Sequence, residues 1–303
     1  MSDSTPRTLP VVQPRDLTPD PVFARVGIVG LGLMGGSLAL ALRERYPRAL
    51  VVGVDRKDVL EEAMRRHAID VAADDLGMLA EVDLVVLAAP VRENIRLLAG
   101  LPDAVPGEAV ITDLSSTKQA IVEAARALPA RLAFVGGHPM AGAARGGFEH
   151  ARPDLYQDRP WLLTPSEGTP VDALHRVQAF AAGVGGVVST VAPAAHDQLL
   201  AYLSHLPQLA VSALMALVGG VVRDPGLALA GRGLVDTTRL ASSPADIWQD
   251  IAATNAVELG RALDALIATL TALRNDLGAG EALADTFEEA ARWRAVLMHD
   301  RKS

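Results

Sequence analysis

The stretch from Arg25 to Arg45, RVGIVGLGLMGGSLALALRER, decides the fold of this chain. It begins with an apolar run, Val26 to Val29, which is followed directly by glycines and then by a helical pattern from Ser37 to Arg45. Such an order predicts a strand, a tight turn and a helix. The glycines stand at positions 30, 32 and 35, which is the GxGxxG spacing.

The glycine spacing predicts a dinucleotide site, because it falls between a strand and a helix. The first glycine permits the tight turn, the second lets the backbone approach a pyrophosphate, and the third lets helix and strand pack closely. The phosphates then lie at the N-terminus of the helix. The residues predicted to contact the cofactor here are Gly30, Leu31, Gly32, Leu33, Met34 and Gly35.

A second apolar run, Leu50 to Val54, ends in Asp55, 20 residues beyond Gly35. An acid at that distance accepts hydrogen bonds from both ribose hydroxyls of the adenosine and repels a 2′-phosphate, so it favours NAD over NADP. Arg56 follows and leaves two possibilities open. Its guanidinium can pair with a 2′-phosphate, or it can stack on the adenine.

Outward from this segment, short runs rich in Val, Ile and Leu alternate with helical patterns. The runs span residues 25–30, 49–55, 83–90, 109–114, 132–137, 160–165 and 185–191. Alternation predicts crossover units, and runs that are apolar throughout predict strands covered by helices on both faces. We therefore expect an α/β domain over residues 25–191, with a Rossmann-type, doubly wound, mostly parallel sheet, after a flexible tail over residues 1–24.

Strand-like runs disappear after Ala192, where long segments rich in Ala and Leu begin. Helices are predicted over residues 196–222, 244–277 and 281–299, with breaks at 224–226 and 278–280. Residues 192–303 are therefore expected to form an all-α domain. The uncharged stretch Leu203 to Val222 is interrupted by His205, Pro207 and Gln208, so we expect a buried central helix of a soluble domain and no membrane contact.

The composition of the 303 residues excludes several classes of protein. A net charge of −8 and a hydrophobic half predict a folded chain that binds no nucleic acid. Cysteine is absent, which excludes disulfides, thiolate nucleophiles and sulfur-ligated metals. No His, Asp and Glu cluster has metal-ligand spacing, and the first 22 residues lack the apolar core of a signal peptide. We expect a cytoplasmic protein that holds no metal.

Two later strand ends reach the edge of the sheet at which ligands bind in parallel α/β proteins. Ala89 and Pro90, at the first, line the nicotinamide side of a cofactor or form a plain turn. The second carries the hydroxyls of Ser115, Ser116 and Thr117, which can cap the next helix or face a substrate.

His138 is the strongest candidate for an acid or a base among the seven histidines. It follows the run Leu132 to Val135 within GGHPMAG, where small residues give a ligand access to its ring. An imidazole titrates near neutral pH, so it can take or share the proton of a hydroxyl that is being oxidised. The alternative is a histidine that is only hydrogen-bonded in a turn.

Three other positions have a structural and a functional interpretation. His205 lies on the most apolar predicted helix, where a histidine is more often a satisfied core residue than a catalyst. In the pair His196-Asp197, the carboxylate can simply favour the positive end of a helix dipole. Arg239, nine residues before Trp248, either clamps a carboxylate with two hydrogen bonds or is a surface arginine.

Taken together, these segments resemble the prephenate and arogenate dehydrogenase family of tyrosine biosynthesis over nearly the whole chain. The resemblance rests on GLGLMGGS, GVDR, TDLSSTK, GGHPMAG, the His196-Asp197 pair, SHLP, TTRLA and DIW. It implies a nucleotide-binding domain, a helical domain that forms a homodimer, and an active site in the cleft between the domains.

The resemblance also implies a chemistry and the residues that perform it. Hydride leaves the ring carbon that bears the hydroxyl for NAD, His138 takes the hydroxyl proton, and the ring carboxylate leaves as CO2 to give a phenol. Ser116 assists His138, and Arg239 binds a substrate carboxylate. The other residues expected at the substrate end are His205, Gln208 and Trp248.

Two departures from the family pattern concern the substrate. Gln208 stands where many relatives carry a histidine, and Ala143-Ala144-Arg145 stands where many carry an acid. A neutral amide tolerates both the pyruvyl side chain of prephenate and the ammonium of arogenate, so relaxed substrate use is favoured.

Two other functions stay open. One is a different two-domain reductase, such as a β-hydroxyacid dehydrogenase or an imine reductase. A catalytic lysine in the helical domain is usual there, whereas the lysines of this chain are Lys57, Lys118 and Lys302. The other is a sensor that binds NAD(H) without turnover.

Overall fold

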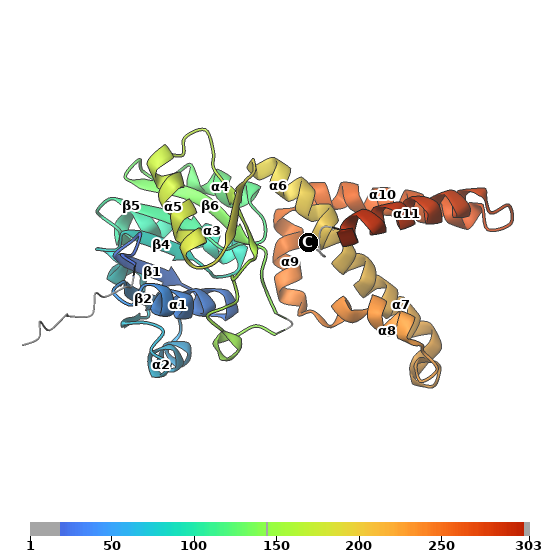
Figure 1. Ribbon diagram of the computed structural model, residues 1–303, viewed down its shortest axis with the longest axis horizontal. Helices are drawn as coiled ribbons and strands as arrows, with labels where there is room; N and C mark the ends of the chain where they lie inside the picture. The colour runs from blue at the N-terminus through green and yellow to red at the C-terminus, as the bar shows by residue number, and fades with distance from the viewer. Residues whose placement is uncertain (1–18, 144, 300–303) are drawn as a thin grey trace, which may run out of the picture.

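An eight-stranded sheet occupies the N-terminal part of the molecule, and only helices follow it in the described residues (Figure 1). The computed structural model describes residues 19–143 and 145–299, so most of the predicted tail and Ala144 lie outside the described residues. The strands in chain order are β1 (Arg25–Val29), β2 (Leu50–Val54), β3 (Val71–Ala73), β4 (Leu84–Leu87), β5 (Ala109–Asp113), β6 (Leu132–Pro139), β7 (Pro160–Thr164) and β8 (Val187–Thr190).

The sheet is doubly wound, with the order β3-β2-β1-β4-β5-β6-β7-β8. Neighbouring strands from β3 to β6 are parallel, β7 is antiparallel to β6, and β8 is parallel to β7. The expected α/β fold with a mostly parallel sheet is therefore confirmed. Strand β3 was not predicted, because it is three residues long and two of them are alanines, which are depleted in strands.

Strand β6 is longer than its apolar run predicts. Residues 136–139 pair with β7, and His138 faces Leu162 in the register. His138 therefore lies within the last residues of a strand, which hold its backbone by a ladder of hydrogen bonds. Periodicity missed this extension because glycine and proline are poor strand formers, and only the pairing with β7 compensates for them.

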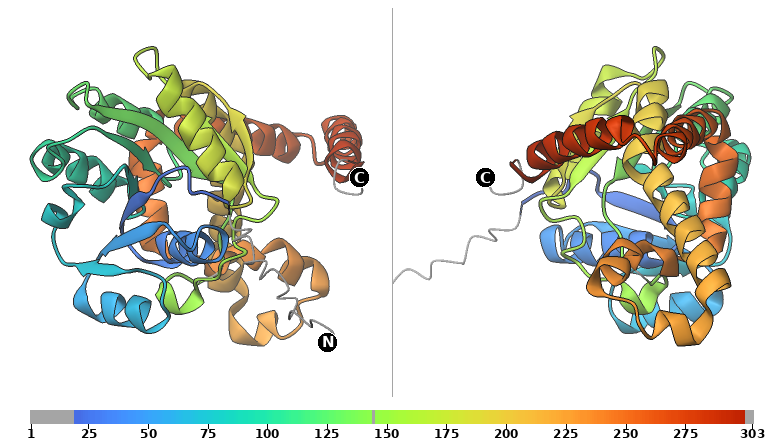
Figure 2. Two further views of the ribbon diagram at one scale, coloured as in Figure 1. Left: turned by 60° about the vertical axis from the view of Figure 1, so that its left-hand side comes forward. Right: turned by 90° about the vertical axis from the view of Figure 1, so that its right-hand side faces the viewer.

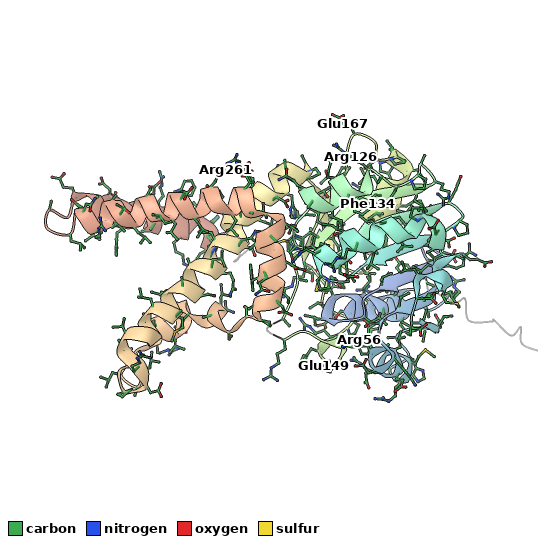
Figure 3. The ribbon with its side chains drawn as sticks, turned by 180° about the vertical axis from the view of Figure 1, so that it is seen from behind. Arg56, Arg126, Phe134, Glu149, Glu167 and Arg261 are labelled. Atoms are coloured by element: carbon green, nitrogen blue, oxygen red, sulfur yellow. The ribbon has the colours of Figure 1, made fainter. Side chains whose placement is uncertain are left out.

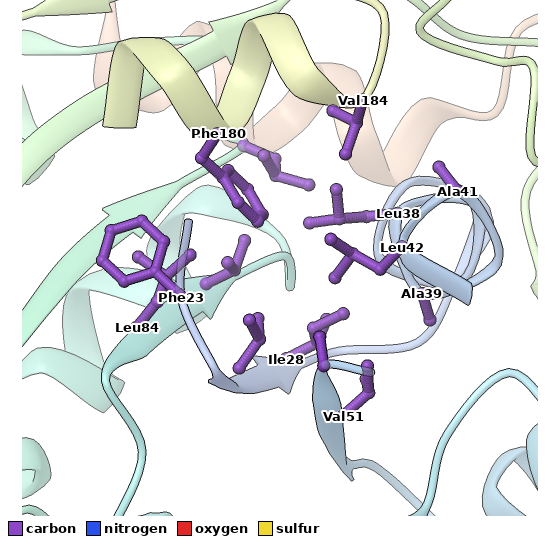
Figure 4. Close-up of a cluster of buried hydrophobic side chains, with 14 of the residues drawn as sticks. Phe23, Ile28, Leu38, Ala39, Ala41, Leu42, Val51, Leu84, Phe180 and Val184 are labelled. Atoms are coloured by element: carbon purple, nitrogen blue, oxygen red, sulfur yellow. The ribbon is translucent and has the colours of Figure 1, made fainter. Parts of the chain in front are cut away.

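Helices cover both faces of the sheet. One face is buried by α1 (Leu33–Arg45), α2 (Lys57–Arg65) and α5 (Val171–Gly183), and the other by α3 (Val91–Ala104), α4 (Gln119–Ala125) and the 3-10 turn η1 (Leu76–Leu79). Figure 4 shows the first cluster, where Leu38 and Leu42 of α1 and Phe180 of α5 meet the strand residue Ile28. Burial on both faces explains the apolar runs of the strands.

The packed part of the chain begins ahead of Arg25. Phe23, which falls in the predicted tail, is 2% exposed. Its ring makes an edge contact with Phe180 at 5.8 Å between centroids, and the guanidinium of Arg176 lies 4.3 Å from its centroid. An aromatic ring of this size is a large apolar surface to bury, so the last residues of the predicted tail belong to the core.

The C-terminal part consists of α6 (Pro193–Leu200), α7 (Leu206–Leu227), α8 (Arg232–Thr237), α9 (Ala245–Thr254), α10 (Ala256–Asn275) and α11 (Glu281–His299), with a π-turn at Ala201–His205, and the 3-10 turn η4 at Arg239–Ser242. The single helix predicted over residues 244–277 is wrong, because the chain breaks at Asn255, whose φ is −129°. The break predicted at 224–226 lies at Arg223, where φ is 57°.

Helices α7 and α8 form one arm and α10 and α11 another, and the two arms diverge as they leave the sheet (Figures 1 and 2). Within residues 206–299 the buried side chains are Gln208, Ile251, Asn255, Leu259 and Ala262. The prediction that residues 203–222 form a buried central helix is therefore wrong for the single chain. In the described residues, one helical segment, Pro193–Leu227, is long and apolar enough to cross a membrane, and 11% of its most apolar window is buried.

Candidate active site

The turn between β1 and α1 forms a cradle of backbone at the carboxyl edge of the sheet. Gly30 has a φ of +94°, and a Cβ on it would lie 2.7 Å from the backbone nitrogen of Ala89, so only glycine fits. A Cβ on Gly35 would overlap the carbonyl oxygen of Gly30. A Cβ on Gly32 would meet nothing within 4 Å, so open space lies in front of this backbone.

Helix α1 begins at this open space without a competing anion. Its N-cap is Gly32, its first turn has no acidic residue, and no side chain caps it. The first backbone N–H groups of the helix are therefore free to bind a phosphate. Leu31 lies in the turn, and Leu33 and Met34 are the first two residues of α1.

Asp55 lies beside the same turn. Its Oδ2 accepts a hydrogen bond from the Leu31 nitrogen at 2.6 Å, and its Oδ1 accepts one from the Arg56 nitrogen at 2.6 Å. Arg56 itself is exposed near the start of α2 (Figure 3), where its guanidinium lies 3.6 Å from the Asp58 carboxylate. The arrangement holds the Asp55 carboxylate by two backbone N–H groups beside the glycine turn.

Asn94 ties two strand ends together and was missed by the sequence reasoning. Its side chain bonds both backbone groups of Ala89, accepting from the nitrogen at 3.1 Å and donating to the oxygen at 2.8 Å. It also donates to the Ser115 hydroxyl at 2.9 Å. The turn with Ala89 and Pro90 is thus fixed against the Ser115 loop. The sequence does carry a signal for Asn94, because it is a polar residue in the first turn of a helix that follows an apolar strand.

Lys118 and Asp113 form a fully buried ion pair under that loop. The Lys118 ammonium also donates to the Gly137 oxygen at 2.8 Å, while Asp113 accepts from the nitrogens of Gly137 and Ser115, each at 3.0 Å. Burial lowers the pKa of Lys118, and the Asp113 carboxylate opposes this shift. The pair joins the ends of β5 and β6, and it holds the loop that carries the half-buried Ser116.

His138 points into a buried chain of polar side chains. Its Nδ1 lies 2.9 Å from Nε2 of His196, and Nδ1 of His196 lies 2.8 Å from Oδ1 of Asp197. Asp197 also accepts hydrogen bonds from the backbone nitrogens of Lys118 at 2.7 Å and Gln119 at 2.8 Å. We call these three residues the His138–His196–Asp197 chain. The sequence reasoning gave His196 and Asp197 no role beyond the helix dipole.

The surroundings keep His138 neutral. Burial, followed by the nearby His196, Lys118 and His205, holds the pKa of His138 well below its usual value of 6.5. A neutral imidazole at pH 7 has one nitrogen with a free lone pair, and it is therefore able to accept a proton.

The substrate end that the sequence predicts is assembled only in part. His205 is 1% exposed, its ring lies 6.2 Å from that of the half-buried Trp248, and Asn255 joins it to the backbone of Asp197. Burial lowers the pKa of His205 to about 4. The buried His205 and the half-buried Trp248 therefore lie next to each other at the junction of the two parts of the molecule.

Gln208 binds within the helical part. Its amide nitrogen donates to the Leu240 oxygen at 2.8 Å, and its oxygen accepts from the Ser243 hydroxyl at 3.2 Å. It thereby holds the η4 turn on which Arg239 lies exposed. No hydrogen bond or ion pair joins the Arg239 guanidinium to another group in residues 19–143 and 145–299. Of the second departure from the family pattern, Ala144 lies outside the described residues.

No group of three or more His, Asp or Glu side chains in the described part of the chain could hold a metal ion.

A glycine cradle at a helix N-terminus, an acid beside it and a neutral buried histidine on the same edge of the sheet define a dinucleotide-dependent dehydrogenase with a helical second domain. Two family models match the chain: the nucleotide-binding domain of prephenate dehydrogenase over residues 38–190, and its dimerization domain over residues 192–289. The chain belongs to the prephenate dehydrogenase family.

Individual relatives agree with this assignment. The cyclohexadienyl dehydrogenase of Zymomonas mobilis is 31% identical over 286 residues, which are 92% of this chain and 98% of that protein. A crystal structure of prephenate dehydrogenase from A. aeolicus, solved with hydroxyphenyl propionate and NAD+, has a TM-score of 0.84 and 28% identity over 93% of this chain and 100% of that one. Synechocystis arogenate dehydrogenase has a TM-score of 0.75 and 30% identity, covering 92% and 99%.

Proposed function

We propose that this chain catalyses the NAD-dependent oxidative decarboxylation of prephenate to 4-hydroxyphenylpyruvate, of arogenate to tyrosine, or of both, in tyrosine biosynthesis. The observation that carries the proposal is the buried His138, whose lowered pKa keeps it neutral, on the same sheet edge as the glycine turn. Neighbouring strands are about 4.8 Å apart, so β6 lies about 10 Å from β4, beside which a nicotinamide would lie. That separation leaves room for one ring-sized substrate.

The cradle residues fit NAD. The open space at Gly32 and the free N–H groups of α1 suit the pyrophosphate, and Asp55 suits the ribose hydroxyls and disfavours a 2′-phosphate. When bound, NAD accepts the hydride that leaves the ring carbon of the substrate. Arg56 is exposed and stacks on the adenine in this proposal.

His138 handles the proton of the reaction. The hydroxyl proton moves to His138 as the carbon-bound hydrogen leaves with its electron pair, and the hydroxyl becomes a carbonyl. The bond to the ring carboxylate then breaks, its electron pair enters the ring, and the carbonyl becomes a phenolate that takes the proton back from His138. The sum releases CO2 and no net proton. Aromatisation drives the step, so the protein needs to orient the reactants and to hold one proton.

The other polar residues complete the proposed site. Ser116, on the loop fixed by the Lys118–Asp113 pair, assists His138 at the hydroxyl. The guanidinium of Arg239, which has no hydrogen-bond or ion-pair partner among the described residues, binds a substrate carboxylate. His205 and Trp248 line the substrate end, and Gln208 acts there by holding the turn that carries Arg239. We place the domain boundary between residues 191 and 192.

We also propose that the chain is a homodimer through its helical domain. The two arms present large apolar side chains to solvent in the single chain, including Leu217 at 66%, Val221 at 73% and Phe287 at 68% exposed. Many exposed apolar side chains on one part of a molecule mark an interaction surface, and a second copy of the same arms covers it.

Buried polar side chains in the segment Pro193–Leu227 favour a cytoplasmic location over a membrane span. The N-terminal part of that segment carries the buried His196 and Asp197, which bond to the nucleotide-binding domain, and the buried His205, which bonds to Asn255 at the start of α10. A span would have to remove these groups from their partners and place them in lipid, which costs several kcal/mol for each unsatisfied group. This cost supports a cytoplasmic location. The net charge of −8 disfavours binding to nucleic acid, which supports a small-molecule substrate.

The proposal is tested by NADH formation. Purified protein is offered prephenate and arogenate separately, with NAD and NADP in parallel, beside the variant His138→Asn. We expect turnover with NAD, and a loss of roughly a hundredfold or more in the variant with normal NAD binding, because the proton acceptor is gone. The ratio of the two substrates measures the relaxed specificity that Gln208 favours.

Two results would overturn parts of the proposal. Turnover that survives in His138→Asn removes the role of His138. Silence of the unmodified protein with both substrates, alongside tight NAD binding, leaves the sensor or a different two-domain reductase as the function.

A further inference from the structure

The His138–His196–Asp197 chain crosses from the sheet to the helical domain. His138 lies on β6, His196 and Asp197 lie on α6, and the exposed fractions of the three side chains are 8%, 0% and 0%. The contacts that hold Asp197 come from both parts of the molecule: the nitrogens of Lys118 and Gln119 at the start of α4, and the Asn255 amide at the start of α10. The chain is therefore anchored at its far end and free only at His138.

The hydrogen-bond partners decide where each proton lies. Both carboxylate oxygens of Asp197 accept backbone N–H groups, which can only donate, so Asp197 is an acceptor throughout. Nδ1 of His196 therefore donates to Asp197, and in neutral His196 the lone pair lies on Nε2. Nδ1 of His138 faces that lone pair at 2.9 Å and must donate to it. The lone pair of His138 is then on Nε2, which no described residue bonds.

We propose that His196 and Asp197 are positioning residues that hold His138 in the tautomer with hydrogen on Nδ1, so that Nε2 is the atom that takes the substrate proton. The role of Nε2 in taking the substrate proton rests on the proposed function, whereas the tautomer follows from the hydrogen bonds alone. When Nε2 takes the proton, Nδ1 keeps its bond to His196, and the Asp197 carboxylate, one imidazole further on, stabilises the positive charge. The opposite tautomer would place a hydrogen on Nε2 and leave no base.

The alternative is that His196 only fills space between β6 and α6. Both interpretations predict that a large change at a fully buried site destabilises the protein, so loss of activity alone does not separate them. The position of the hydrogen on His138 does separate them, because a space-filling neighbour has no preference between the two nitrogens. His196→Gln keeps an acceptor near the Nε2 position, whereas His196→Leu has similar bulk and no acceptor.

The test is nitrogen NMR of the full-length protein labelled with ¹⁵N histidine, without substrate, with His138 assigned from the signals that vanish in His138→Asn. We expect hydrogen on Nδ1 and none on Nε2 of His138 at neutral pH. In His196→Leu we expect this preference to be lost and kcat to fall about tenfold to a hundredfold with an unchanged KM for NAD, and in His196→Gln both to recover in part. The exposed His175→Leu is the matched control and stays unchanged.

Each outcome decides the matter. Hydrogen on Nε2, or on both nitrogens, in the unmodified protein overturns the inference, even if His196→Leu fails to fold. An unaltered tautomer and kcat in a folded His196→Leu overturn it as well. The tautomer of His138 is measured without substrate, so the measurement tests the inference independently of activity. If neither prephenate nor arogenate is turned over, that result refutes the proposed function and leaves the tautomer measurement valid.

Discussion

Single residues in this site take their chemistry from what surrounds them. His138 and His205 are ordinary histidines in the sequence, but burial lowers the pKa of both, and at His205 the Asp197 carboxylate opposes this shift. Asp55 is an ordinary strand-end acid that becomes a ribose ligand candidate because backbone N–H groups hold it beside the glycine turn.

The lowered pKa values predict a loss of stability in acid. Between pH 6.5 and about 4, His205 is protonated in the unfolded chain but stays neutral in the folded chain. The free energy of unfolding therefore falls as the pH falls through this window, by up to about 1.4 kcal/mol per pH unit for each such histidine. His138 acts in the same direction.

Urea unfolding across this pH range measures the effect. We expect His205→Gln to reduce the slope of the unfolding free energy against pH by the contribution of one histidine. The exposed His175→Gln serves as a control and keeps the original dependence. If His205→Gln keeps it too, His205 is not the neutral buried group described above.

At the scale of elements, the β1–α1 turn separates packing from binding. Gly30 and Gly35 are required by the backbone itself, because an added Cβ meets Ala89 or the Gly30 carbonyl. Gly32 faces open space, so no packing contact requires a glycine there. Its lack of a side chain instead leaves room for the pyrophosphate of a dinucleotide. The three glycines of one motif therefore have different physical roles.

This difference predicts that two alanine substitutions differ in their effect on the melting temperature. Gly32→Ala should keep the melting temperature and weaken NAD binding by about tenfold or more, because its methyl group occupies the place of the pyrophosphate. Gly35→Ala should lower the melting temperature as well. Calorimetric NAD titration and thermal unfolding of both variants measure this, and NAD binding that is unchanged in Gly32→Ala would place the pyrophosphate elsewhere.

At the scale of the whole molecule, the sheet domain is complete in itself and the helical domain is not. The sheet has two buried clusters, one on each face. The arms carry few buried side chains and many exposed apolar ones. In the proposed dimer a second copy supplies the missing half of the core, so we expect the stability of the helical domain to depend on protein concentration.

The dimer is tested by a charge placed on an arm. Val221→Glu or Phe287→Glu should shift the protein from dimer to monomer in sedimentation equilibrium, because an unpaired carboxylate is costly to bury in an apolar interface. Met78→Glu, on the 55% exposed Met78 of the sheet domain, is the matched control and should leave the dimer intact. A monomeric unmodified protein at micromolar concentration would refute the dimer.

The sequence by itself determined the parts that depend on local pattern. The strand, turn and helix around Gly30 and the acid at Asp55 follow from spacing, because backbone conformation and side-chain period act over a few residues. The change from alternating strands to helices near Ala192 is visible for the same reason. The corresponding elements are found in the structure, with β3 added and the stretch after Pro244 divided at Asn255.

Only the tertiary structure decided the contacts between distant segments. His138 and His196 are 58 residues apart, and Asn255 is 58 residues from Asp197. Their hydrogen bonds depend on how α6 and α10 pack against the sheet, which no local period encodes. The exposure of α7 was also unpredictable from apolar content, because the same apolar face suits a core or a partner, and only packing tells which surface is left uncovered.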